Sequence, residues 1–369
     1  MQDKKILFIL HLPPPIHGAS MVGQFLVDSD MIKKRFITKH VNLGVTKSLR
    51  EQKDVSFGKI YHFLKLFKQC LTSYRSYKPD LVYITLASNG LGFYKDALIV
   101  LMLKAQGAKL LYHFHNKGIR NHQHKLIDNL LYWYVLRKVE IIITSKRLYP
   151  DLKKYVNEYM VHYCHNGIPK IDNELKIRDL NRDNRPTKIL FLSNLIETKG
   201  VYTLLQACRY LHDRNVNFHC TFIGGEGDIT AVELQSKIES LGLLNRVRYE
   251  GKKFGDEKHI AFENADIFAF PTHNDCFPLV LLEAMQHSMP IVSTPEGGIP
   301  DIVEDNVSGF LVPQNDPECL ADKLELLIND VVLQLEMGKK GFEKYQEQFT
   351  VGIYEENLAK IFTSVLDKK

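Results

Sequence analysis

The sequence predicts an α/β protein made of two open domains, each a doubly wound parallel sheet, that face each other across a cleft. The first observation is length, because 369 residues exceed what a single hydrophobic core usually holds. The second is the alternation of short apolar runs with longer amphipathic segments, which is typical of parallel strands joined by crossover helices. The third is that runs such as 6–10 and 141–143 are apolar throughout, as strands buried on both faces are.

The first half of the chain carries one such series of elements. Strands are expected at residues 5–10, 37–43, 81–86, 109–115, 140–145 and 161–164, and helices near 19–29, 59–77, 92–106, 122–138 and 148–157. Residues 170–186 are then polar, rich in Asp, Asn and Arg, and bounded by prolines. This composition predicts a linker, so the first domain is expected to cover residues 1–169.

A second series follows the linker and defines a second domain over residues 187–351. Strands are expected at 188–193, 218–223, 247–250, 267–271, 291–294 and 310–312, with helices near 200–213, 229–241, 257–263, 279–287, 316–329 and 331–346. Ligands of open α/β sheets bind outside the carboxyl ends of the strands. The loops that follow these strands are therefore the places where binding residues are expected.

Composition narrows the class of protein. Hydrophobic residues make up 45% of the chain and charged residues 25%, which excludes a disordered tail, a collagen-like chain and a disulfide-stapled mini-protein. The six cysteines are scattered without a C-x-x-C pair, as in a reducing compartment. No apolar run approaches the roughly 20 residues that span a bilayer, and the N-terminus lacks the features of a signal peptide. A cytoplasmic protein is therefore expected.

Charge is divided unequally between the two halves. Residues 1–170 contain 27 lysines and arginines against 11 acidic residues, a net of +16, and residues 171–369 carry a net of −11. A basic half suits an anionic membrane, a phosphorylated substrate or nucleic acid as its partner. No nucleic acid is expected, because the sequence contains no RNP, helix-turn-helix or zinc-finger pattern.

The most informative stretch is residues 271–285, PTHNDCFPLVLLEAM. Pro278 stands where a helix can begin, since its missing N–H costs nothing in a first turn. The N–H groups of Leu279 and Val280 would then point out of the helix start, which is a favourable seat for a diphosphate.

Two acids flank that helix start. Glu283 lies about one turn further into the helix, where its carboxylate can accept two hydrogen bonds from a ribose diol. Asp275 lies in the loop before the helix, where it can accept hydrogen bonds from the hydroxyl groups of a sugar. The alternative is a capped amphipathic helix with an incidental pair of acids.

Two other loops carry candidate binding residues. The stretch 191–200, FLSNLIETKG, follows an expected buried strand and opens a helix, so Lys199 should face the carboxyl edge of the sheet and offer a compact cation to phosphate oxygens. A solvated lysine that caps the helix is the alternative. In the loop 11–20, Gly18 lets the backbone approach a ligand closely, although the loop is not the G-x-G-x-x-G of a dinucleotide site.

Taken in order, these motifs resemble the retaining glycosyltransferases of the GT4 type, which have the GT-B fold of two Rossmann-like domains. The family's E-x7-E element resembles the span from Asp275 to Glu283, its lysine–glycine helix opening resembles Lys199-Gly200, and its glycine loop resembles His17-Gly18. Further similar segments are Tyr112 to Asn116 (with His115), 165–168 (HNGI), 223–227 (IGGEG) and 295–303 (PEGGIPDIV). The last helix, 352–369, is expected to return to the first domain, as it does in the family.

The resemblance implies transfer of a sugar from a nucleoside-diphosphate donor, UDP- or GDP-linked, with retention of anomeric configuration. It assigns catalytic roles to His115, Lys199 and Asp275. It assigns donor binding to Gly18, Ser193, Asn194, Lys199, Gly224, Asp275, Cys276, Phe277, Leu279, Val280 and Glu283. Lys199, the Gly18 amide and the helix start would stabilise the departing diphosphate, and His115 would supply a hydrogen bond to the sugar. No cofactor and no metal ion is expected.

Two positions depart from the family's pattern. The family usually has an arginine beside the lysine, but the turn here reads SNL at residues 193–195. Arg246, Lys252 or Lys253 are the candidates to replace that charge, or Asn194 hydrogen-bonds instead. Asp275 is one methylene shorter than the usual glutamate, so the sugar is expected to sit differently or to be bound through water.

Two patterns that suggest metal binding have simpler interpretations. The sequence DSD at residues 28–30 spells the D-x-D signature of the other glycosyltransferase fold. Its place near a helix end, before a basic run, predicts an ordinary surface turn. Histidines at 113, 115, 122 and 124 are not expected to form a zinc site, because the second pair would diverge on a helix.

The basic half contains an amphipathic segment with two interpretations. Apolar side chains recur at helical spacing, with Lys65, Lys68 and Arg75 roughly opposite; they are Ile60, Phe63, Leu64, Phe67, Leu71 and Tyr74. One interpretation is a crossover helix packed on its sheet. The other is a helix that docks on an anionic membrane surface and presents the domain to a lipid-linked acceptor. One helix can do both.

The leading hypothesis from the sequence is a cytoplasmic, peripherally membrane-associated retaining glycosyltransferase. It would extend a lipid-linked glycan in the biosynthesis of a polysaccharide or glycoconjugate. The alternatives are a GT-B nucleotide-sugar 2-epimerase and a non-catalytic protein that binds sugar nucleotides.

Overall fold

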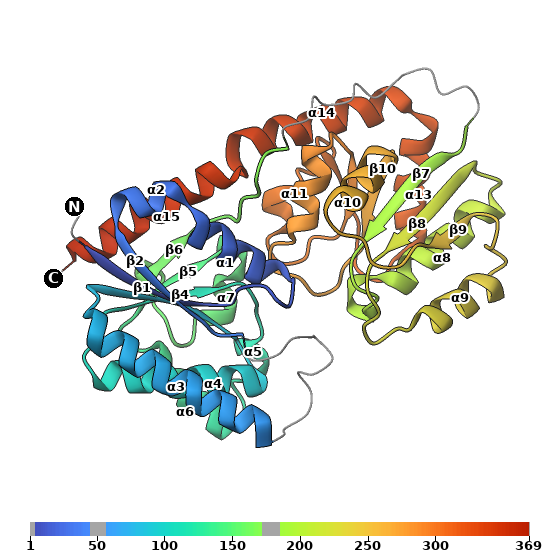
Figure 1. Cartoon of the computed structure of the whole chain (residues 1–369). Coiled ribbons are helices and arrows are strands. Elements are labelled where there is room, and N and C mark those ends of the chain that lie inside the picture. The colour runs from blue at the N-terminus through green and yellow to red at the C-terminus, as the bar shows by residue number, and fades with distance from the viewer. Residues whose placement is uncertain (1–3, 45–56, 172–184, 369) are drawn as a thin grey trace. The chain divides into compact units, whose positions relative to one another are not determined.

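The structure is a computed structural model, and it describes residues 4–44, 57–171 and 185–368. The chain forms two compact units: unit 1 is Met1–Gly167 with Val351–Lys369, and unit 2 is Ile168–Thr350. Most of the expected linker, residues 172–184, lies outside the described residues. Each unit holds one parallel six-stranded sheet with helices on both faces (Figure 1), so the predicted pair of doubly wound α/β domains is confirmed.

Unit 1 is built on a sheet with the strand order β2-β1-β3-β4-β5-β6. The strands are β1 (Lys5–Leu10), β2 (Ile37–Asn42), β3 (Leu81–Leu86), β4 (Leu110–Phe114), β5 (Glu140–Ile143) and β6 (Val161–Tyr163). The central strands β3 and β4 are buried at every residue, as apolar strands covered on both faces should be. The carboxyl ends of β1 and β3 frame the switch point of this sheet, because the order of the strands reverses there.

Helices cover both faces of that sheet. One side carries α3 (Phe57–Tyr77), α4 (Gly90–Ala105) and α6 (Leu126–Leu136), and the other carries α1 (Gly18–Asp28), α2 (Asp30–Arg35) and α15 (Val351–Asp367) (Figure 1). The C-terminal helix α15 packs directly on the sheet. The ring centroid of its Phe362 lies 5.9 Å from that of Phe8 on β1 and 5.6 Å from that of Tyr83 on β3. Burial of these aromatic rings attaches the last helix to unit 1.

Unit 2 has the strand order β12-β11-β10-β7-β8-β9. Its strands are β7 (Thr187–Leu192), β8 (Phe218–Ile223), β9 (Val247–Tyr249), β10 (Ile267–Phe270), β11 (Ile291–Ser293) and β12 (Gly309–Leu311). Numbered from the first strand of the unit, this is the order of the Rossmann dinucleotide-binding sheet. Its switch point lies between β7 and β10, where ligands of such sheets bind.

The helices of unit 2 also lie on both sides of the sheet. They are α8 (Val201–Asp213), α9 (Ala231–Ser240) and α13 (Pro317–Asn329) on one side, and α10 (Gly255–Glu263), α11 (Leu279–Gln286) and α14 (Val331–Gln348) on the other (Figure 1). A short helix, α12 (Ile299–Ile302), follows β11. Each of α8 and α11 begins at the carboxyl edge of the sheet, because each follows a parallel strand directly.

In unit 1, two of the expected helices differ from the structure, and one helix was not expected. Helix α2 is additional: the Ser29 hydroxyl accepts a hydrogen bond from the Ile32 N–H at 3.1 Å, so the chain starts a new capped helix directly after α1. The helix expected over 122–138 is two helices, α5 (Ile119–His122) and α6. The helix expected near 148–157 is a 3-10 turn, η2 (Lys146–Leu148), followed by the short α7 (Tyr149–Leu152).

A carboxylate from a distant part of the chain explains where α5 begins. Asp151 accepts hydrogen bonds from the N–H groups of Gly118, Ile119 and Arg120, at 2.9, 3.1 and 2.8 Å. These bonds satisfy the free N–H groups of the helix start. The acceptor lies in a segment more than 30 residues away, so the sequence near α5 does not reveal it.

The packed face of α3 is displaced from the predicted one. Leu66, Cys70 and Ser73 are buried, whereas Ile60 and Leu64 are 49% and 59% exposed. The first interpretation, in which the apolar side chains pack on the sheet, therefore does not hold for Ile60 and Leu64. The sheet side of α3 carries the small side chains of Cys70 and Ser73, which allow the helix to lie close to its neighbours.

Two predictions about covalent and membrane character can be compared with the described residues. All six cysteines are unbridged; five are buried and Cys319 is half-buried, as expected for small apolar side chains. Within the described ranges, no helix combines the length and the apolarity needed to cross a bilayer.

Candidate functional site

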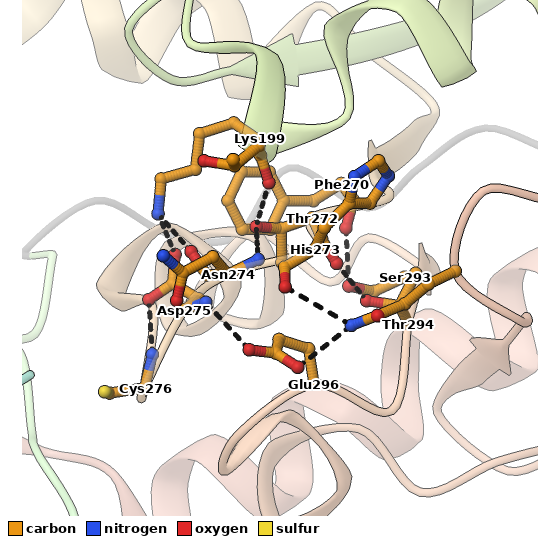
Figure 2. Close-up of polar contacts among 12 residues, drawn as sticks. Lys199, Phe270, Thr272, His273, Asn274, Asp275, Cys276, Ser293, Thr294 and Glu296 are labelled. Carbon is orange, nitrogen blue, oxygen red and sulfur yellow. Dashed lines mark hydrogen bonds and ion pairs between the residues drawn. The ribbon is translucent and has the colours of Figure 1, made fainter. Parts of the chain in front are cut away.

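The loops that follow β7 and β10 meet at the switch point of unit 2, since these strands are neighbours in the sheet. The ammonium nitrogen of Lys199, in the first loop, lies 2.6 Å from Oδ2 of Asp275 in the second and 2.9 Å from the carbonyl oxygen of Asn274 (Figure 2). The side chains of Lys199 and Asp275 are 23% and 17% exposed. The ion pair is therefore partly shielded, yet water and solutes can reach it.

A glycine brings the two loops together. The 3-10 turn η4 (Glu197–Lys199) leads into Gly200, whose φ of 84° is left-handed. A Cβ atom on Gly200 would lie 2.1 Å from the carbonyl oxygen of Pro271. Only glycine combines that conformation with so close an approach, and the approach places Lys199 beside the β10 loop.

Hydrogen bonds then fix the distance between the loops. The His273 N–H and the Thr272 hydroxyl both donate to the carbonyl oxygen of Thr198, at 2.7 and 3.2 Å. The imidazole Nε2 of His273 also lies 3.2 Å from the hydroxyl oxygen of Thr203 on α8. Burial lowers the pKa of His273 below its ordinary value, so its ring is neutral at pH 7.

The backbone of Asp275 is held by the loop that follows β11, and its carboxylate by its own loop (Figure 2). Its Oδ1 accepts a hydrogen bond from the Cys276 N–H at 2.9 Å. Its own N–H donates to Oε1 of Glu296 at 3.3 Å, and Nε2 of Gln314 donates to Oε2 of Glu296 at 2.9 Å. A Cβ atom on Gly297, whose φ is 54°, would lie 2.3 Å from the carbonyl oxygen of Asp275. Glu296 and Gln314 therefore position Asp275.

Helix α11 begins directly behind the Asp275 loop. Pro278 is its N-cap and no side chain caps it. The N–H groups of Leu279 and Val280 therefore have no acceptor within the helix, and both residues are half-buried. The first turn of α11 carries the partial positive charge and the free donors that favour an anion.

Two other residues predicted to bind the donor have buried side chains. Cys276 is 6% exposed and Phe277 is 4% exposed. The ring of Phe277 packs edge-on against that of Phe349, with 5.8 Å between centroids. What these two positions can offer a ligand is therefore their backbone.

Glu283, one turn into α11, pairs with a residue that the sequence analysis missed. Its Oε1 lies 2.6 Å from the ammonium nitrogen of Lys258 on α10. Their side chains are 19% and 25% exposed. The pair involves one carboxylate oxygen, and the other receives no hydrogen bond from a described residue. Nothing in the sequence of α10 marks Lys258, because it lies 25 residues away from Glu283.

The loop after β8 adjoins the loop after β7. A Cβ atom on Gly224, whose φ is 157°, would lie 1.7 Å from the carbonyl oxygen of Ser193. The amide oxygen of Asn194 accepts a hydrogen bond from the Gly225 N–H at 3.2 Å. Ser193, Asn194 and Gly224 are thus brought together, and Asn194 joins the two loops.

One candidate to replace the family's arginine is placed at the wrong edge. Arg246 immediately precedes β9, and its guanidinium donates to the amide oxygen of Asn217 at 3.1 Å. Asn217 precedes β8, so both residues lie where the strands begin. Because the ligand edge of a parallel sheet is where its strands end, the prediction for Arg246 is wrong.

The other two candidates follow β9 at the correct edge. Lys253 forms an ion pair with Glu250. Lys252 is exposed and lies beside the β8 loop, since its Cδ would be 3.3 Å from a Cβ atom on Gly225. Its ammonium nitrogen lies 4.6 Å from the centroid of the Phe254 ring, a contact that leaves the charge open to an anion. Lys252 is thus the better-placed second cation.

The corresponding edge of unit 1 carries His115, directly after β4. Its ring centroid lies 4.0 Å from that of His113, whose Nδ1 is 2.6 Å from the Tyr83 hydroxyl. Both ring nitrogens of His115 are buried without a hydrogen-bond partner among the described residues. Burial, aided by His17, lowers the pKa of His115 to about 4. Its imidazole is therefore neutral at pH 7, with one donor and one acceptor nitrogen.

The glycine loop of unit 1 forms the start of α1. His17 caps the helix. Its ring nitrogen Nδ1 accepts a hydrogen bond from the backbone N–H of Ser20 at 3.3 Å, and the backbone N–H of His17 donates to the Ser20 hydroxyl at 3.0 Å. A Cβ atom on Gly18 would meet nothing within 4 Å, so the backbone there is open to approach. In the same loop, the pKa of His11 is lowered to about 3, mainly by burial and to a smaller extent by the charge of Lys95.

Within the part of the chain that the structure describes, no group of three or more His, Cys, Asp or Glu side chains could hold a metal ion. In the D-x-D sequence, Asp28 ends α1 and accepts a hydrogen bond from Gln24 at 2.8 Å, while Asp30 begins α2. This is the predicted surface turn between two helices.

The arrangement in unit 2 defines what chemistry it can support. A lysine ammonium group and the free N–H groups of a helix start can together stabilise negative charge on a diphosphate. The carboxylates of Asp275 and Glu283 can accept hydrogen bonds from hydroxyl groups. The loops after β7 and β10, together with α11, therefore combine an anion site with acceptors for a polyhydroxylated ligand.

Known proteins with similar sequences agree with this chemistry. Residues 172–344 match the model of the family described as glycosyl transferases group 1. The chain is 35% identical over 161 residues to the amylovoran biosynthesis glycosyltransferase AmsK of Erwinia amylovora, a match that covers 42% of this chain and 39% of that protein. It is 30% identical over 188 residues to the putative colanic acid biosynthesis glycosyltransferase WcaL of Escherichia coli (strain K12), covering 49% and 46%. The chain thus spans less than half the length of these curated relatives.

Solved structures resemble nearly the whole chain. The crystal structure of Anabaena Alr3699/HepE in complex with UDP and glucose has a TM-score of 0.74 at 19% identity, covering 98% of this chain and 100% of that one. Sucrose-phosphate synthase from Thermosynechococcus elongatus also has a TM-score of 0.74, at 16% identity, covering 99% and 100%. At these identities the likeness shows the fold alone. The fold is GT-B, with its two Rossmann-like domains, as predicted.

Proposed function

We propose that the protein is a retaining glycosyltransferase, because residues 172–344 match the model of the glycosyl transferases group 1 family and the chain has the GT-B fold. It transfers a sugar from a UDP- or GDP-linked donor to a lipid-linked glycan acceptor. The names of the relatives, which refer to amylovoran and colanic acid biosynthesis, support a place in polysaccharide biosynthesis. The UDP in the Anabaena structure supports a nucleoside-diphosphate donor.

The observation that carries this proposal is the Lys199–Asp275 pair at the switch point of unit 2. A 2.6 Å ion pair places a cation and a hydroxyl acceptor side by side, next to the free N–H groups of α11. A nucleotide sugar requires that combination, because its diphosphate is anionic and its sugar presents hydroxyl groups. A capped helix with an incidental pair of acids does not account for Gly200, Gly224 and Gly297, which bring together the four loops after β7, β8, β10 and β11.

The chemical step breaks the bond between the anomeric carbon and the diphosphate oxygen, and the diphosphate leaves with the electron pair. The acceptor hydroxyl oxygen forms the new bond to that carbon and passes its proton to the departing diphosphate. Lys199 and the N–H groups of Leu279 and Val280 stabilise the charge that grows on the departing diphosphate. Glu283 accepts from the ribose and Asp275 from the sugar.

In unit 1, we assign His115 a hydrogen bond to the sugar and the Gly18 amide a contact with the diphosphate. The unpartnered nitrogens of His115 and the open space at Gly18 support these roles. The reaction needs no metal ion in this mechanism, because Lys199 and the α11 N-terminus supply the positive charge. Turnover is therefore expected to persist in the presence of EDTA.

The first experiment is a thermal-shift screen against UDP, GDP and their sugars, because a ligand that binds the native state raises its apparent stability. One base is expected to raise the melting temperature, and the Lys199→Ala variant is expected to lose that response. The donor that binds is then tested for transfer, and NMR of the product reports whether the anomeric configuration is retained. If no nucleoside diphosphate raises the melting temperature, the proposed function is wrong.

The same donor separates the alternatives. A 2-epimerase forms its product without any acceptor, whereas a transferase forms glycoside only when an acceptor is present. A non-catalytic binding protein retains the donor intact. Slow donor hydrolysis that Glu283→Ala abolishes would exclude that possibility.

A further inference from the structure

Helix α6 presents an apolar face to solvent. Five of its large side chains are between 46% and 82% exposed; they are Leu126, Ile127, Leu130, Trp133 and Tyr134. Their spacing, i, i+1, i+4, i+7 and i+8, places them on one side of the helix. Asp128, Tyr132, Val135 and Leu136 are buried on the opposite side. One face of α6 therefore packs on unit 1, and the other is apolar and is not covered by any residue in the described ranges.

Cations surround that apolar face. Lys125 precedes α6, and Arg137 and Lys138 follow it, and all three are exposed. The guanidinium carbon of Arg137 lies 4.7 Å from the centroid of the Trp133 ring. The helix itself contains one acid, Asp128, which is 3% exposed. The solvent face of α6 thus has an apolar centre with positive ends and no accessible negative charge.

We infer that the exposed face of α6 is a docking surface for an anionic lipid bilayer. The helix lies in the plane of the interface, with Leu126, Ile127 and Leu130 among the upper acyl chains and Lys125 and Arg137 at the phosphates. Trp133 and Tyr134 occupy the headgroup level, where amphipathic rings are favoured. A short, strongly apolar face with flanking cations is the composition of such interfacial helices.

Charge distinguishes a bilayer from a second copy of this chain. In a two-fold dimer through this face, the antiparallel helices would bring Lys125 of one copy beside Arg137 and Lys138 of the other, and like charges would repel. A parallel pairing would place the same cations side by side. An anionic surface instead attracts both ends of the helix, and the net charge of +16 over residues 1–170 adds to the attraction.

The surface extends along the same side of the sheet. Helix α4 lies on the same side as α6 and joins it, since the ammonium nitrogen of Lys104 lies 2.9 Å from the carbonyl oxygens of both Tyr134 and Arg137. Helix α3 lies on the same side (Figure 1). Its exposed residues include Ile60 and Leu64. The choice of a lipid partner rests in part on the proposed function, in which the acceptor is lipid-linked. The exposure of the apolar face is observed independently of that function.

The chain contains a single tryptophan, and it stands in this face, so its fluorescence tests the inference directly. The full chain is mixed with vesicles of phosphatidylcholine alone or of phosphatidylcholine with phosphatidylglycerol. Anionic vesicles are expected to bind the protein, shift the emission of Trp133 to the blue and protect it from acrylamide. High salt is expected to weaken the binding. No binding to the anionic vesicles, or binding without a change at Trp133, overturns the inference.

Matched variants identify the face. The triple variant Ile127→Ser, Leu130→Ser and Tyr134→Ser keeps the tryptophan and is expected to lower the vesicle partition coefficient about tenfold. The control changes exposed apolar residues of unit 2, by Val232→Ser, Leu244→Ser and Val332→Ser, which are 78%, 54% and 57% exposed. The control is expected to bind as the wild type does. Equal loss in both variants, or no loss in the first, overturns the inference.

Two further measurements separate the other outcomes. If light scattering shows a dimer without vesicles, and the triple variant is monomeric, the face is an interface between copies and the inference is wrong. A thermal shift with UDP and GDP is measured on every variant, because that response depends on unit 2. Vesicle binding without a nucleotide response would overturn the proposed function but support the docking surface. A nucleotide response without vesicle binding would support the proposed function and overturn the docking surface.

Discussion

Lys199 and Asp275 are 76 residues apart in the sequence, and their charged atoms are 2.6 Å apart in the structure. The pair holds the lysine ammonium group at the edge of unit 2 in the absence of a phosphate. A diphosphate that binds there must share the cation with Asp275 or displace the carboxylate. This competition distinguishes the roles of the two residues, and the first two predictions use it.

Lys199→Ala is expected to lower turnover by about 10²–10³, because one preorganised donor to the developing charge is lost. Affinity for the nucleoside diphosphate should fall as well, since the lysine charge acts on the bound diphosphate too. Steady-state kinetics and calorimetry measure the two effects. The control is Lys188→Ala, which removes an exposed lysine near the start of β7. The loop that carries Lys199 follows the other end of that strand. Unchanged turnover in Lys199→Ala would contradict the phosphate role.

Asp275→Asn is expected to separate binding from transfer. Removing the carboxylate frees Lys199 and removes a negative charge near the diphosphate, so affinity for the free diphosphate should rise, by about tenfold. Transfer should fall about a hundredfold or more, because the amide no longer accepts hydrogen bonds from the sugar as a carboxylate does. Calorimetry with the diphosphate and kinetics with the sugar nucleotide test this. If the variant loses both diphosphate affinity and transfer, or loses neither, the carboxylate does not compete for the lysine.

Substitutions in the Glu283–Lys258 pair are expected to affect nucleotide binding and stability differently. Glu283→Ala is expected to weaken nucleotide binding, because a ribose hydroxyl loses its acceptor. Loss of the partly exposed ion pair should cost less than about 1 kcal/mol of stability. The matched variant is Lys258→Met, which breaks the same 2.6 Å ion pair and leaves the carboxylate. If Lys258→Met weakens binding as much as Glu283→Ala does, the pair positions α11 and Glu283 does not contact the ribose.

Gly200→Ala is expected to lower the free energy of unfolding by about 2–4 kcal/mol, because the new Cβ would overlap a backbone carbonyl at a left-handed φ. Denaturant titration measures the change. The control is Gly352→Ala in α15, where a Cβ atom would meet nothing within 4 Å. That substitution is expected to be neutral or to stabilise by up to about 1 kcal/mol. A stable Gly200→Ala protein would mean that the two loops can separate without cost.

Unit 1 is expected to lose stability in acid. The pKa of His115 is lowered from 6.5 to about 4, and that of His11 to about 3, so between pH 6.5 and 4 the unfolded chain binds protons that the folded chain does not. Stability is therefore unaffected by these groups above pH 6.5 and falls as pH decreases, by up to about 1.4 kcal/mol per pH unit for each histidine.

Trp133 lies in unit 1, so urea titration followed by its fluorescence measures this dependence. The double variant His11→Gln and His115→Gln is expected to flatten the fall between pH 6.5 and 4. His124→Gln, at an exposed position, is the control and should leave the slope unchanged. An acid slope that persists in the double variant would assign it to other groups.

The strands were predictable because they are short, apolar and buried on both faces. A short run that is apolar throughout, such as residues 81–86, is typical of a strand that is buried on both faces of a sheet. Loop residues were predictable where the chemistry is local: Lys199 opens a helix, and Pro278 marks the start of another. The start of α5 was not, because the carboxylate that caps it, Asp151, belongs to a later segment.

The sequence by itself determined the two α/β domains, and it named Lys199, Asp275 and Glu283 as candidates for one site. Only the tertiary structure decided which groups pair, because contacts between loops depend on which strands are neighbours. It placed Lys258 beside Glu283 and Glu296 behind Asp275, and it put Arg246 at the wrong edge. It also decided which apolar face of α6 is covered, since both faces of this helix carry apolar side chains.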